Sequence, residues 1–139
     1  MKRTAKAHWE GTVKDGRGNL TTQSETLNQT NYSFRTRFVG DETGTNPEEL
    51  LAAAHAGCFT MAVSLGLTEK GCVPSALDTE AVVSMDNAGI TGVHLIITGR
   101  VDGITAGEFE AITKQAEQNC LISKVLRIPI SSEAMLISA

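Results

Sequence analysis

Residues 46–70, NPEELLAAAHAGCFTMAVSLGLTEK, decide the fold of this chain because they predict one long helix with a well-marked start. Asn46 is a preferred N-cap residue, Pro47 suits the first helical position, and Glu49 at the third position completes a capping pattern. Glycine commonly follows a helix end, and Gly71 stands there. We therefore expect a helix that starts at Pro47 and ends at about residue 70.

The predicted helix is apolar on nearly all sides between residues 50 and 67. A surface helix has one apolar stripe, whereas a helix that is apolar all round is buried. This segment also carries small residues that would let another backbone approach closely: Ala52, Ala53, Ala54, Ala56 and Gly57. We expect a central helix that is covered on most of its sides.

The segments on either side of this helix predict strands and one more helix. Three strands are expected before it, over residues 4–13, 20–27 and 32–39, and three after it, over residues 76–85, 90–101 and 128–137. Thr105 and Glu108 form a capping box that opens a second helix, which ends near Cys120. The order β-β-β-α-β-β-α-β indicates an α+β fold with mostly antiparallel sheets, and we expect residues 1–139 to form a single domain.

The predicted strand over residues 32–39 has two different faces. Side chains alternate between the faces of a strand, so Phe34 and Phe38 would lie on one face and Arg35 and Arg37 on the other. We expect the phenylalanine face to join a core and the arginine face to present cations.

Length and charge argue against several classes of function. The chain has 139 residues, 41% of them hydrophobic, which is typical of one globular domain. The net charge is -4 and the pI is near 5.3, so we expect neither nucleic acid nor a membrane as partner. Residues 1–8 are too polar for a signal peptide, and the apolar run around Cys58 carries polar side chains, unlike a membrane span. We expect a cytoplasmic protein.

The chain has three cysteines, and Cys58 lies in the middle of the apolar helix. Structural disulfides are rare in a reducing compartment, so a bond between these thiols would be transient and catalytic. Free cysteine is also among the most buried residue types, so Cys58 alone could be inert packing. Cys120 follows 62 residues later (120 − 58), where we expect a chain reversal to expose it. The spacing does not decide whether these two thiols meet, and we expect Cys72 to be a surface or packing cysteine.

Three segments together resemble the paired cysteine motifs of the OsmC/Ohr family, the osmotically inducible and organic hydroperoxide resistance proteins. They are GTNPEEL at 44–50, AAHAGCF at 53–59 and NCLIS at 119–123. The resemblance covers nearly the whole chain, including AHWEG at 7–11 and the residues 37–38. The arginine before the first motif and the AAHA run before Cys58 are similar to the OsmC branch.

The resemblance implies an OsmC-like fold and a thiol-dependent peroxidase that reduces organic hydroperoxides to alcohols without a metal, haem or other cofactor. By the same resemblance, Cys58 is similar to the peroxidatic cysteine and Cys120 to the resolving cysteine, with a disulfide between them as intermediate. Arg37 and Glu48 are similar to the pair that activates the thiolate. An external dithiol, lipoyl-linked or from another thiol system, would reduce the disulfide. The family usually has proline after the second cysteine, where this chain has Leu121.

Physical chemistry explains why such a site needs these residue types. A thiol with the usual pKa of about 8.5 is only roughly 3% thiolate at pH 7, and burial in an apolar helix lowers that share further. Arginine opposes this effect because guanidinium stays charged in a dry site and can donate hydrogen bonds to sulfur and to peroxide oxygens. We expect Glu48 to hold Arg37 in place. The carboxylate must lie beyond the arginine, since a carboxylate beside the sulfur would disfavour the thiolate.

The positions of Glu48 and Cys58 predict how the protein assembles. Ten residues separate them on one helix, which is about 15 Å along the axis and about 80° around it. The two side chains therefore cannot share a site within one helix, whereas an antiparallel second copy could supply the glutamate. We expect an intertwined homodimer with two active sites at its interface.

Other patterns give weaker hypotheses. A non-enzymatic redox sensor or small-molecule binding protein would use the same thiols without turnover. His55 lies one turn before Cys58, so a Cys-His hydrolase is conceivable, although a histidine there commonly bonds a neighbouring polar group. The histidines show no metal-ligand spacing and the glycines no nucleotide-binding pattern, so we expect neither ligand. Three apolar residues could line a site for alkyl hydroperoxides or simply pack in the core: Phe59, Met61 and Leu65.

Overall fold

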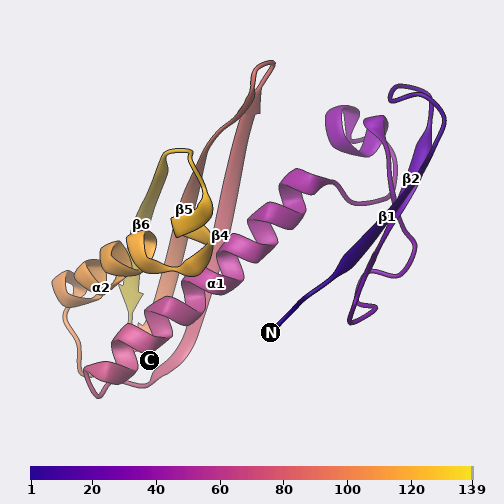
Figure 1. The fold of residues 1–139 in the computed structure, drawn as a ribbon. Helices are drawn as coiled ribbons and strands as arrows, with labels where there is room; N and C mark the ends of the chain where they lie inside the picture. The colour runs from indigo at the N-terminus through magenta and orange to yellow at the C-terminus, as the bar shows by residue number, and fades with distance from the viewer. Residues whose placement is uncertain (139) are drawn as a thin grey trace. The chain divides into compact units, whose positions relative to one another are not determined.

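The computed structural model describes residues 1–138 and divides into two compact units, Met1–Leu50 and Leu51–Ala139. The elements follow in the order β1 (Ala5–Glu10), β2 (Arg17–Thr22), β3 (Thr30–Tyr32), η1 (Arg35–Val39), α1 (Pro47–Glu69), β4 (Pro74–Asp86), β5 (Gly89–Val101), α2 (Ala106–Asn119), α3 (Leu121–Val125) and β6 (Ile130–Ile137) (Figure 1). This mixed architecture confirms the predicted α+β class. Helix α1 starts in the first unit and continues in the second.

The first unit contains an antiparallel sheet in the order β1-β2-β3. Its central strand carries Gly18, which lies opposite Trp9 on one side and opposite Tyr32 on the other. The Trp9 and Tyr32 rings pack with their centroids 5.4 Å apart. A Cβ atom at Gly18 would lie 2.6 Å from the Trp9 ring and 2.7 Å from the Tyr32 ring. Glycine at this position therefore allows the two rings to meet across the central strand.

The predicted strand over residues 32–39 is wrong beyond its first residue, because the chain enters the π-helical turn η1. Ser33 and Thr36 exchange hydrogen bonds there: the Ser33 N–H donates to Thr36 Oγ1 at 2.8 Å, and the Thr36 N–H donates to Ser33 Oγ at 3.2 Å. Such bonds from side chains to the local backbone compete with the pairing of a strand. Gly40 then ends the turn in a left-handed conformation with a φ of 78°.

The helical turn also changes the expected faces. Phe34 and Phe38 still meet, with ring centroids 4.9 Å apart, because residues i and i+4 are neighbours on a helical turn. The two arginines take different partners: Arg35 pairs with an exposed carboxylate and Arg37 with one that is nearly buried. The predicted face of two arginines is therefore wrong.

Helix α1 confirms the prediction made from the residues that flank it. Asn46 Oδ1 accepts a hydrogen bond from the Glu49 N–H at 2.8 Å, as an N-cap residue does. At the other end Gly71 takes a left-handed φ of 78°, the conformation that favours glycine after a helix. The start and the end of α1 thus follow from local chemistry.

One side of α1 is open within a single chain, although we expected cover on most sides. Phe59, Val63 and Leu67 are completely buried in the core of the second unit, whereas Met61 and Leu65 are 76% and 60% exposed. By length and composition alone α1 could cross a membrane, a property that core helices of soluble proteins share. A contiguous apolar surface of this kind marks an interaction site.

The second unit contains a sheet in the order β4-β5-β6. Strands β4 and β5 form the predicted antiparallel hairpin, and β6 pairs with β5 in parallel, which requires a crossover that includes α2. Helix α2 starts at the predicted capping box, where Thr105 Oγ1 accepts from the Glu108 N–H at 3.1 Å and the Glu108 carboxylate accepts from the Thr105 N–H at 2.9 Å. That hydrogen bond from the Thr105 backbone, with a second from its hydroxyl, lowers the pKa of Glu108.

The core of the second unit joins the sheet to α1 and α2. Val93, Leu95 and Ile97 alternate along β5 and are at most 3% exposed. They form one cluster with the buried residues of both helices. Gly99 continues this row, and a Cβ atom there would lie 2.6 Å from the Phe109 ring of α2. The missing side chain at Gly99 thus makes room for the aromatic ring.

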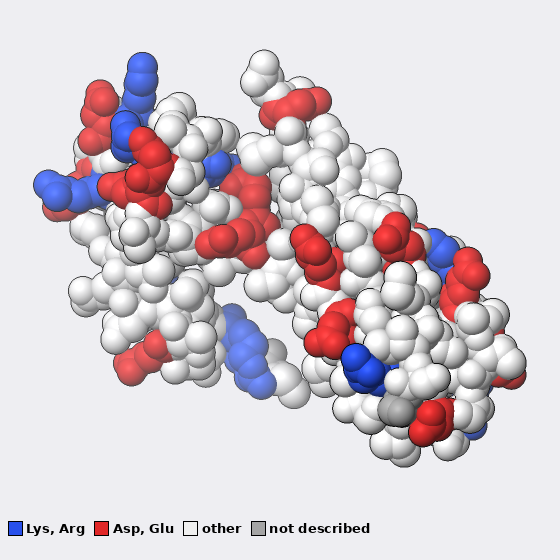
Figure 2. All heavy atoms as spheres, turned by 180° about the vertical axis from the view of Figure 1, so that it is seen from behind, with Lys and Arg blue, Asp and Glu red and all other residues white. Residues whose placement is uncertain are grey.

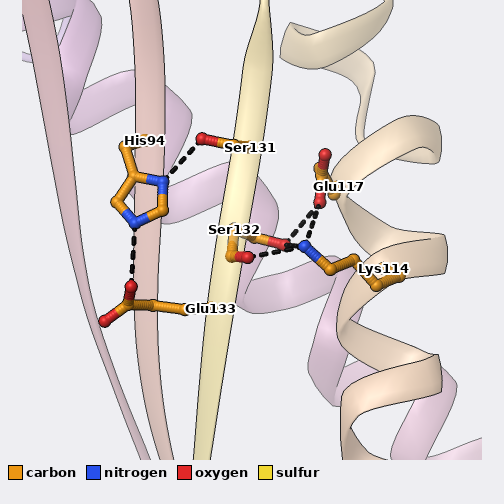
Figure 3. Close-up of polar contacts among 6 residues, drawn as sticks. All are labelled: His94, Lys114, Glu117, Ser131, Ser132 and Glu133. Atoms are coloured by element: carbon orange, nitrogen blue, oxygen red, sulfur yellow. Dashed lines mark hydrogen bonds and ion pairs between the residues drawn. The ribbon is translucent and has the colours of Figure 1, made fainter.

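The alternate residues of β5 and β6 carry polar groups. His94 Nδ1 lies 2.6 Å from Ser131 Oγ, and His94 Nε2 lies 3.1 Å from Glu133 Oε2 (Figure 3). Ser132, between them in β6, bonds towards α2 instead, where Lys114 Nζ donates to its carbonyl at 2.6 Å. The alternation of a strand therefore separates an exposed His-Ser-Glu group from the helix-covered side.

The surface carries charges of both signs. Figure 2 shows acidic side chains spread over the face that it draws, with basic side chains beside some of them. The chain as a whole has 12 basic and 16 acidic residues. Nucleic-acid binding typically uses basic side chains clustered on one face, and Figure 2 shows no large basic cluster among residues 1–138 on the face that it draws.

Candidate functional site

Arg37 and Glu48, which the family resemblance singled out, form an ion pair within one chain in the first unit. Arg37 lies on η1 and Glu48 in the first turn of α1, and Asn46 connects these elements because it caps α1 and donates to the Thr36 carbonyl at 3.2 Å. Arg37 Nε donates to Glu48 Oε1 at 2.8 Å and to Oε2 at 3.1 Å, while Nη2 donates to Oε1 at 2.6 Å. The residue that caps α1 therefore also ties η1 to the start of the helix.

The ion pair with Glu48 fixes the direction in which the Arg37 guanidinium points. The Glu48 side chain is 10% exposed and the Arg37 side chain 42% exposed, so the carboxylate is held in the protein while the guanidinium reaches solvent. Bidentate contact restricts a guanidinium in angle as well as in distance. Glu48 engages the edge formed by Nε and Nη2, which leaves the Nη1 edge directed away from the carboxylate. Both partners belong to the same chain, so the pair itself does not need a second copy.

An apolar pocket of about 230 Å³ lies next to this ion pair in the first unit. Half of its lining residues are aromatic and one is a cation: Trp9, Val13, Tyr32, Ser33, Phe34, Arg37, Phe38 and Pro47. The Arg37 guanidinium lies over the Phe38 ring at 5.1 Å from its centroid, a cation–π arrangement. The pocket can hold an apolar group whose polar end meets the arginine.

Cys58 lies on α1 in the second unit, half-buried and free. It packs against the cluster of buried residues that also contains Cys120. A Cβ atom at the neighbouring Gly57 would meet nothing within 4 Å, so the helix surface beside the thiol is open within one chain. Cys58 therefore stands at the border between the core and an accessible side of α1.

Cys120 is buried, with 3% of its surface exposed, so the prediction that a chain reversal exposes it is wrong. Its backbone is extended and joins α2 to α3, and its sulfur caps the second of these helices. Cys120 Sγ accepts a hydrogen bond from the Ser123 N–H at 3.3 Å and lies 3.0 Å from Ser123 Oγ. The thiol takes the place of the serine or aspartate oxygen of an ordinary N-cap.

The leucine after Cys120 has a local explanation. Leu121 is the first residue of α3, and its side chain is 73% exposed. Proline is favoured at the first position of a helix because the N–H there has no partner within the helix. Leu121 can occupy the same position, so the departure from the family pattern leaves the cap by Cys120 in place.

His55 connects α1 to this cap. His55 is fully buried, and its Nε2 lies 2.8 Å from Ser123 Oγ. Burial lowers the pKa of His55 below its ordinary value of 6.5. Ser123 is the residue that the sequence analysis missed, although the spacing of Cys120 and Ser123 matches that of an N-cap and its N3 position. The histidine bonds a polar neighbour, as is common for this position.

The structure thus assembles two groups of predicted residues, each within one unit. Arg37 and Glu48 meet in the first unit, whereas Cys58 and Cys120 pack against one core in the second. Cys72 is half-buried against the edge of that core, with its sulfur 3.6 Å from the Gly103 carbonyl. Within residues 1–138 no group of three or more His, Cys, Asp or Glu side chains is arranged to hold a metal ion.

Comparisons with known proteins agree with the cysteine motifs. The model of the OsmC-like protein family matches residues 40–134. Peroxiredoxin OsmC of Escherichia coli strain K12 is 47% identical over 140 residues, which cover 98% of this chain and 97% of that protein. Organic hydroperoxide resistance protein OhrA of Bacillus subtilis strain 168 is 37% identical over 86 residues, 60% of each chain.

The fold also matches solved structures. The crystal structure of the organic hydroperoxide resistance protein OhrB of Bacillus subtilis superposes with a TM-score of 0.68 at 23% identity, over 96% of this chain and 98% of that one. The family match and the full-length relative lead to the same assignment: this chain belongs to the OsmC-like protein family, as its two cysteine motifs predicted.

Proposed function

We propose that this protein is a cysteine-based peroxidase that reduces organic hydroperoxides to alcohols. The observation that carries the proposal is the hydrogen bond between His55 and Ser123, which ties the cap formed by Cys120 to the turn of α1 that precedes Cys58. Residues three apart on a helix lie on neighbouring positions of one face. This link supports a reaction between Cys58 and Cys120, and a 47% identical relative bears the name peroxiredoxin.

The proposed cycle has three steps. The Cys58 thiolate attacks the distal oxygen of the hydroperoxide, the O–O bond breaks, and the alkoxide leaves as alcohol after it takes up a proton. Cys58 is then a sulfenic acid. Cys120 condenses with it to a disulfide and releases water. An external dithiol, lipoyl-linked or from another thiol system, reduces this disulfide to two thiols by exchange.

The aromatic pocket supports an organic substrate. Its volume of about 230 Å³ is many times the roughly 10–15 Å³ of cavity volume that one water molecule needs. Hydrogen peroxide would leave most of this apolar space unfilled, whereas an alkyl group would cover it. Arg37 stands at the wall of the pocket, where its guanidinium can donate to the peroxide oxygens and favour the thiolate.

We also propose a homodimer in which α1 forms part of the interface. The support is the open apolar side of α1, with Met61 and Leu65 exposed in a single chain. Glu48 and Cys58 lie ten positions apart on this helix, so a pair of Arg37 and Glu48 from one chain can serve the thiol of its partner. Two active sites would then lie at the interface.

Residues 1–139 are proposed to form one domain in a cytoplasmic protein. Two facts support a single domain: α1 runs through the boundary between the two compact units, and the family match spans it. The described cysteines, Cys58, Cys72 and Cys120, are free thiols, which suits a reducing compartment.

Mass spectrometry after one equivalent of cumene or tert-butyl hydroperoxide tests the chemistry. We expect a disulfide between Cys58 and Cys120, with Cys72 left free. The variant Cys58→Ser should lose turnover with dithiothreitol or dihydrolipoamide as reductant, and Cys72→Ser is the matched control that should keep it. Oxidation of the wild type once, without further turnover, would favour a redox sensor instead. A disulfide that links Cys72 would contradict the assignment.

A further inference from the structure

A row of polar atoms links Cys120 to His55 in the core of the second unit. Cys120 Sγ lies 3.0 Å from Ser123 Oγ, and Ser123 Oγ lies 2.8 Å from His55 Nε2. Cys120, Ser123 and His55 are 3%, 7% and 0% exposed. Because the row is shielded from water, a proton that leaves the thiol finds its nearest acceptors within the row.

We propose that this row removes the proton from the Cys120 thiol when the disulfide forms, with Ser123 as a catalytic residue and His55 as a positioning residue. The inference rests on the proposed function, which supplies the oxidised Cys58. Ser123 Oγ accepts the thiol proton while its own hydroxyl proton passes to His55 Nε2. The Ser123 N–H, which donates to Cys120 Sγ at 3.3 Å, stabilises the thiolate that results.

Atoms and electrons balance in this step. The Cys120 sulfur forms an S–S bond with the Cys58 sulfur, and the S–O bond of the sulfenic acid breaks. Cys120 is oxidised from thiol to disulfide, and Cys58 is reduced from sulfenic acid to disulfide. The leaving hydroxide combines with one proton, equal to the one that Cys120 gave up. The net products are one disulfide and one water molecule, and no further oxidant or reductant is needed.

The surroundings of His55 suit a proton acceptor. Burial lowers the pKa of His55 below 6.5, so the ring is neutral and can accept a proton at neutral pH. Burial is the only cause of this lowering, and no charged side chain contributes to it. Cys120 is linked to the ring through Ser123, and Cys58 lies three positions after His55 on α1. For Nε2 to accept, the ring proton lies on Nδ1.

The other ring nitrogen supports this direction of transfer. His55 Nδ1 is buried and has no hydrogen-bond partner among residues 1–138. A histidine retained only for structure is expected to satisfy both nitrogens when buried. Here one nitrogen is left alone while the other is aimed at Ser123. The single hydrogen bond therefore orients the His55 ring towards the Ser123 hydroxyl and leaves the second buried nitrogen without a partner among residues 1–138.

The chain offers a matched control in a second histidine–serine pair. His94 Nδ1 lies 2.6 Å from Ser131 Oγ on the exposed group of β5 and β6 (Figure 3). This pair has the same two side chains at a similar distance, and its other hydrogen bond goes to Glu133. Ser131→Ala therefore removes a histidine–serine bond without touching the row that ends at Cys120.

The test measures the two steps separately. Reduced protein receives one equivalent of tert-butyl hydroperoxide, and rapid quench with mass spectrometry follows the sulfenic acid at Cys58, trapped by dimedone, and the disulfide with Cys120. In Ser123→Ala we expect the sulfenic acid to form and the disulfide to form at least about 100-fold more slowly, the lower end of general acid–base effects. Ser123→Thr keeps the hydroxyl and should restore much of the rate, and Ser131→Ala should match the wild type.

The pH profile distinguishes a proton acceptor from a structural role. In the wild type we expect the rate of disulfide formation to fall by much less than tenfold per pH unit between pH 7.5 and 6.5, because the lowered pKa keeps His55 mostly neutral there. An unassisted thiol with a pKa of about 8.5 would lose about tenfold per pH unit over this range. His55→Gln keeps an amide near the serine but cannot take up a proton, so its rate should follow the unassisted profile.

The outcomes separate the two proposals. Equal rates of disulfide formation in the wild type and Ser123→Ala would overturn the inference about the row and leave the peroxidase proposal standing. A tenfold fall in the rate of disulfide formation per pH unit in the wild type would also overturn the inference. This measurement needs no variant, so it decides the question even if a variant fails to fold. Absence of both the sulfenic acid at Cys58 and the disulfide with Cys120 in the wild type would instead refute the proposed function, and this inference with it.

Discussion

Replacing Glu48 by glutamine tests whether the carboxylate holds Arg37 in place for the proposed reaction. Glu48 Oε1 accepts from Arg37 Nε at 2.8 Å and from Nη2 at 2.6 Å, and Oε2 accepts from Nε at 3.1 Å. A glutamine can keep its oxygen at the Oε1 position, but its NH₂ group then faces the Nε donor. Bonds to charged groups contribute about 1.5–3 kcal/mol. Because the arginine is 42% exposed, solvent screens the pair, and we expect Glu48→Gln to lower the free energy of unfolding by about 1 kcal/mol.

The effect of Glu48→Gln on reactivity should be larger than its effect on stability. A displacement of about 1 Å in a positioned group can cost about 100-fold in rate, so we expect the reaction with peroxide to slow by about ten- to 100-fold. The assay is the second-order rate constant for loss of the Cys58 thiol with tert-butyl hydroperoxide. Asp41→Asn is the matched control, because it breaks the exposed pair that Arg35 makes on the same turn. A wild-type rate in Glu48→Gln beside a slow Arg37→Ala would refute the positioning role.

Three further predictions concern stability and assembly. Below pH 6.5 the unfolded chain takes up a proton before the buried His55 does, so the wild type should lose about 1.4 kcal/mol of unfolding free energy per pH unit relative to His55→Gln, until the lower folded-state pKa is reached. Parallel denaturation curves for the two proteins would contradict this. Gly99→Ala should destabilise by about 1–3 kcal/mol in thermal unfolding, because its Cβ would lie 2.6 Å from the Phe109 ring. Gly107→Ala, where a Cβ meets nothing within 4 Å, should stabilise by about 0.5–1 kcal/mol, and the same sign in both would count against the packing argument. Met61→Asp should give a folded monomer in sedimentation, whereas a persistent dimer would exclude the open side of α1 as the interface.

Features that depend on neighbouring residues could be predicted from the sequence. Asn46 and Glu49 start α1, and Thr105 and Glu108 start α2, through hydrogen bonds that span only three positions. The hairpin of β4 and β5 likewise follows from a short turn. These signals are local, so no knowledge of the fold is needed to interpret them.

Two kinds of feature could not be predicted from the sequence. In one kind two local structures compete for the same residues, and in the other the residues that meet lie far apart in the chain. Alternation over residues 32–39 fits a strand, but the exchange of hydrogen bonds between Ser33 and Thr36 favours a helical turn. The bond between His55 and Ser123 joins positions 68 residues apart, and no local pattern encodes it. The apolar residues of α1 follow no helical periodicity because they occur on nearly all sides of the helix. The sequence therefore could not distinguish the buried side of α1 from its open side.

In the proposed cycle Cys120 is a redox group as well as a helix cap, which would link the stability of α3 to the reduction potential of the protein. The reduced sulfur accepts the Ser123 N–H at 3.3 Å, and a disulfide sulfur is a weaker acceptor, so oxidation weakens the cap. An N-cap contributes about 1 kcal/mol, which equals about 20 mV in a two-electron couple. The direction follows from linkage: α3 favours the thiol and makes a disulfide at Cys120 easier to reduce. A helix of five residues thus sets part of the driving force with which a dithiol can regenerate the protein.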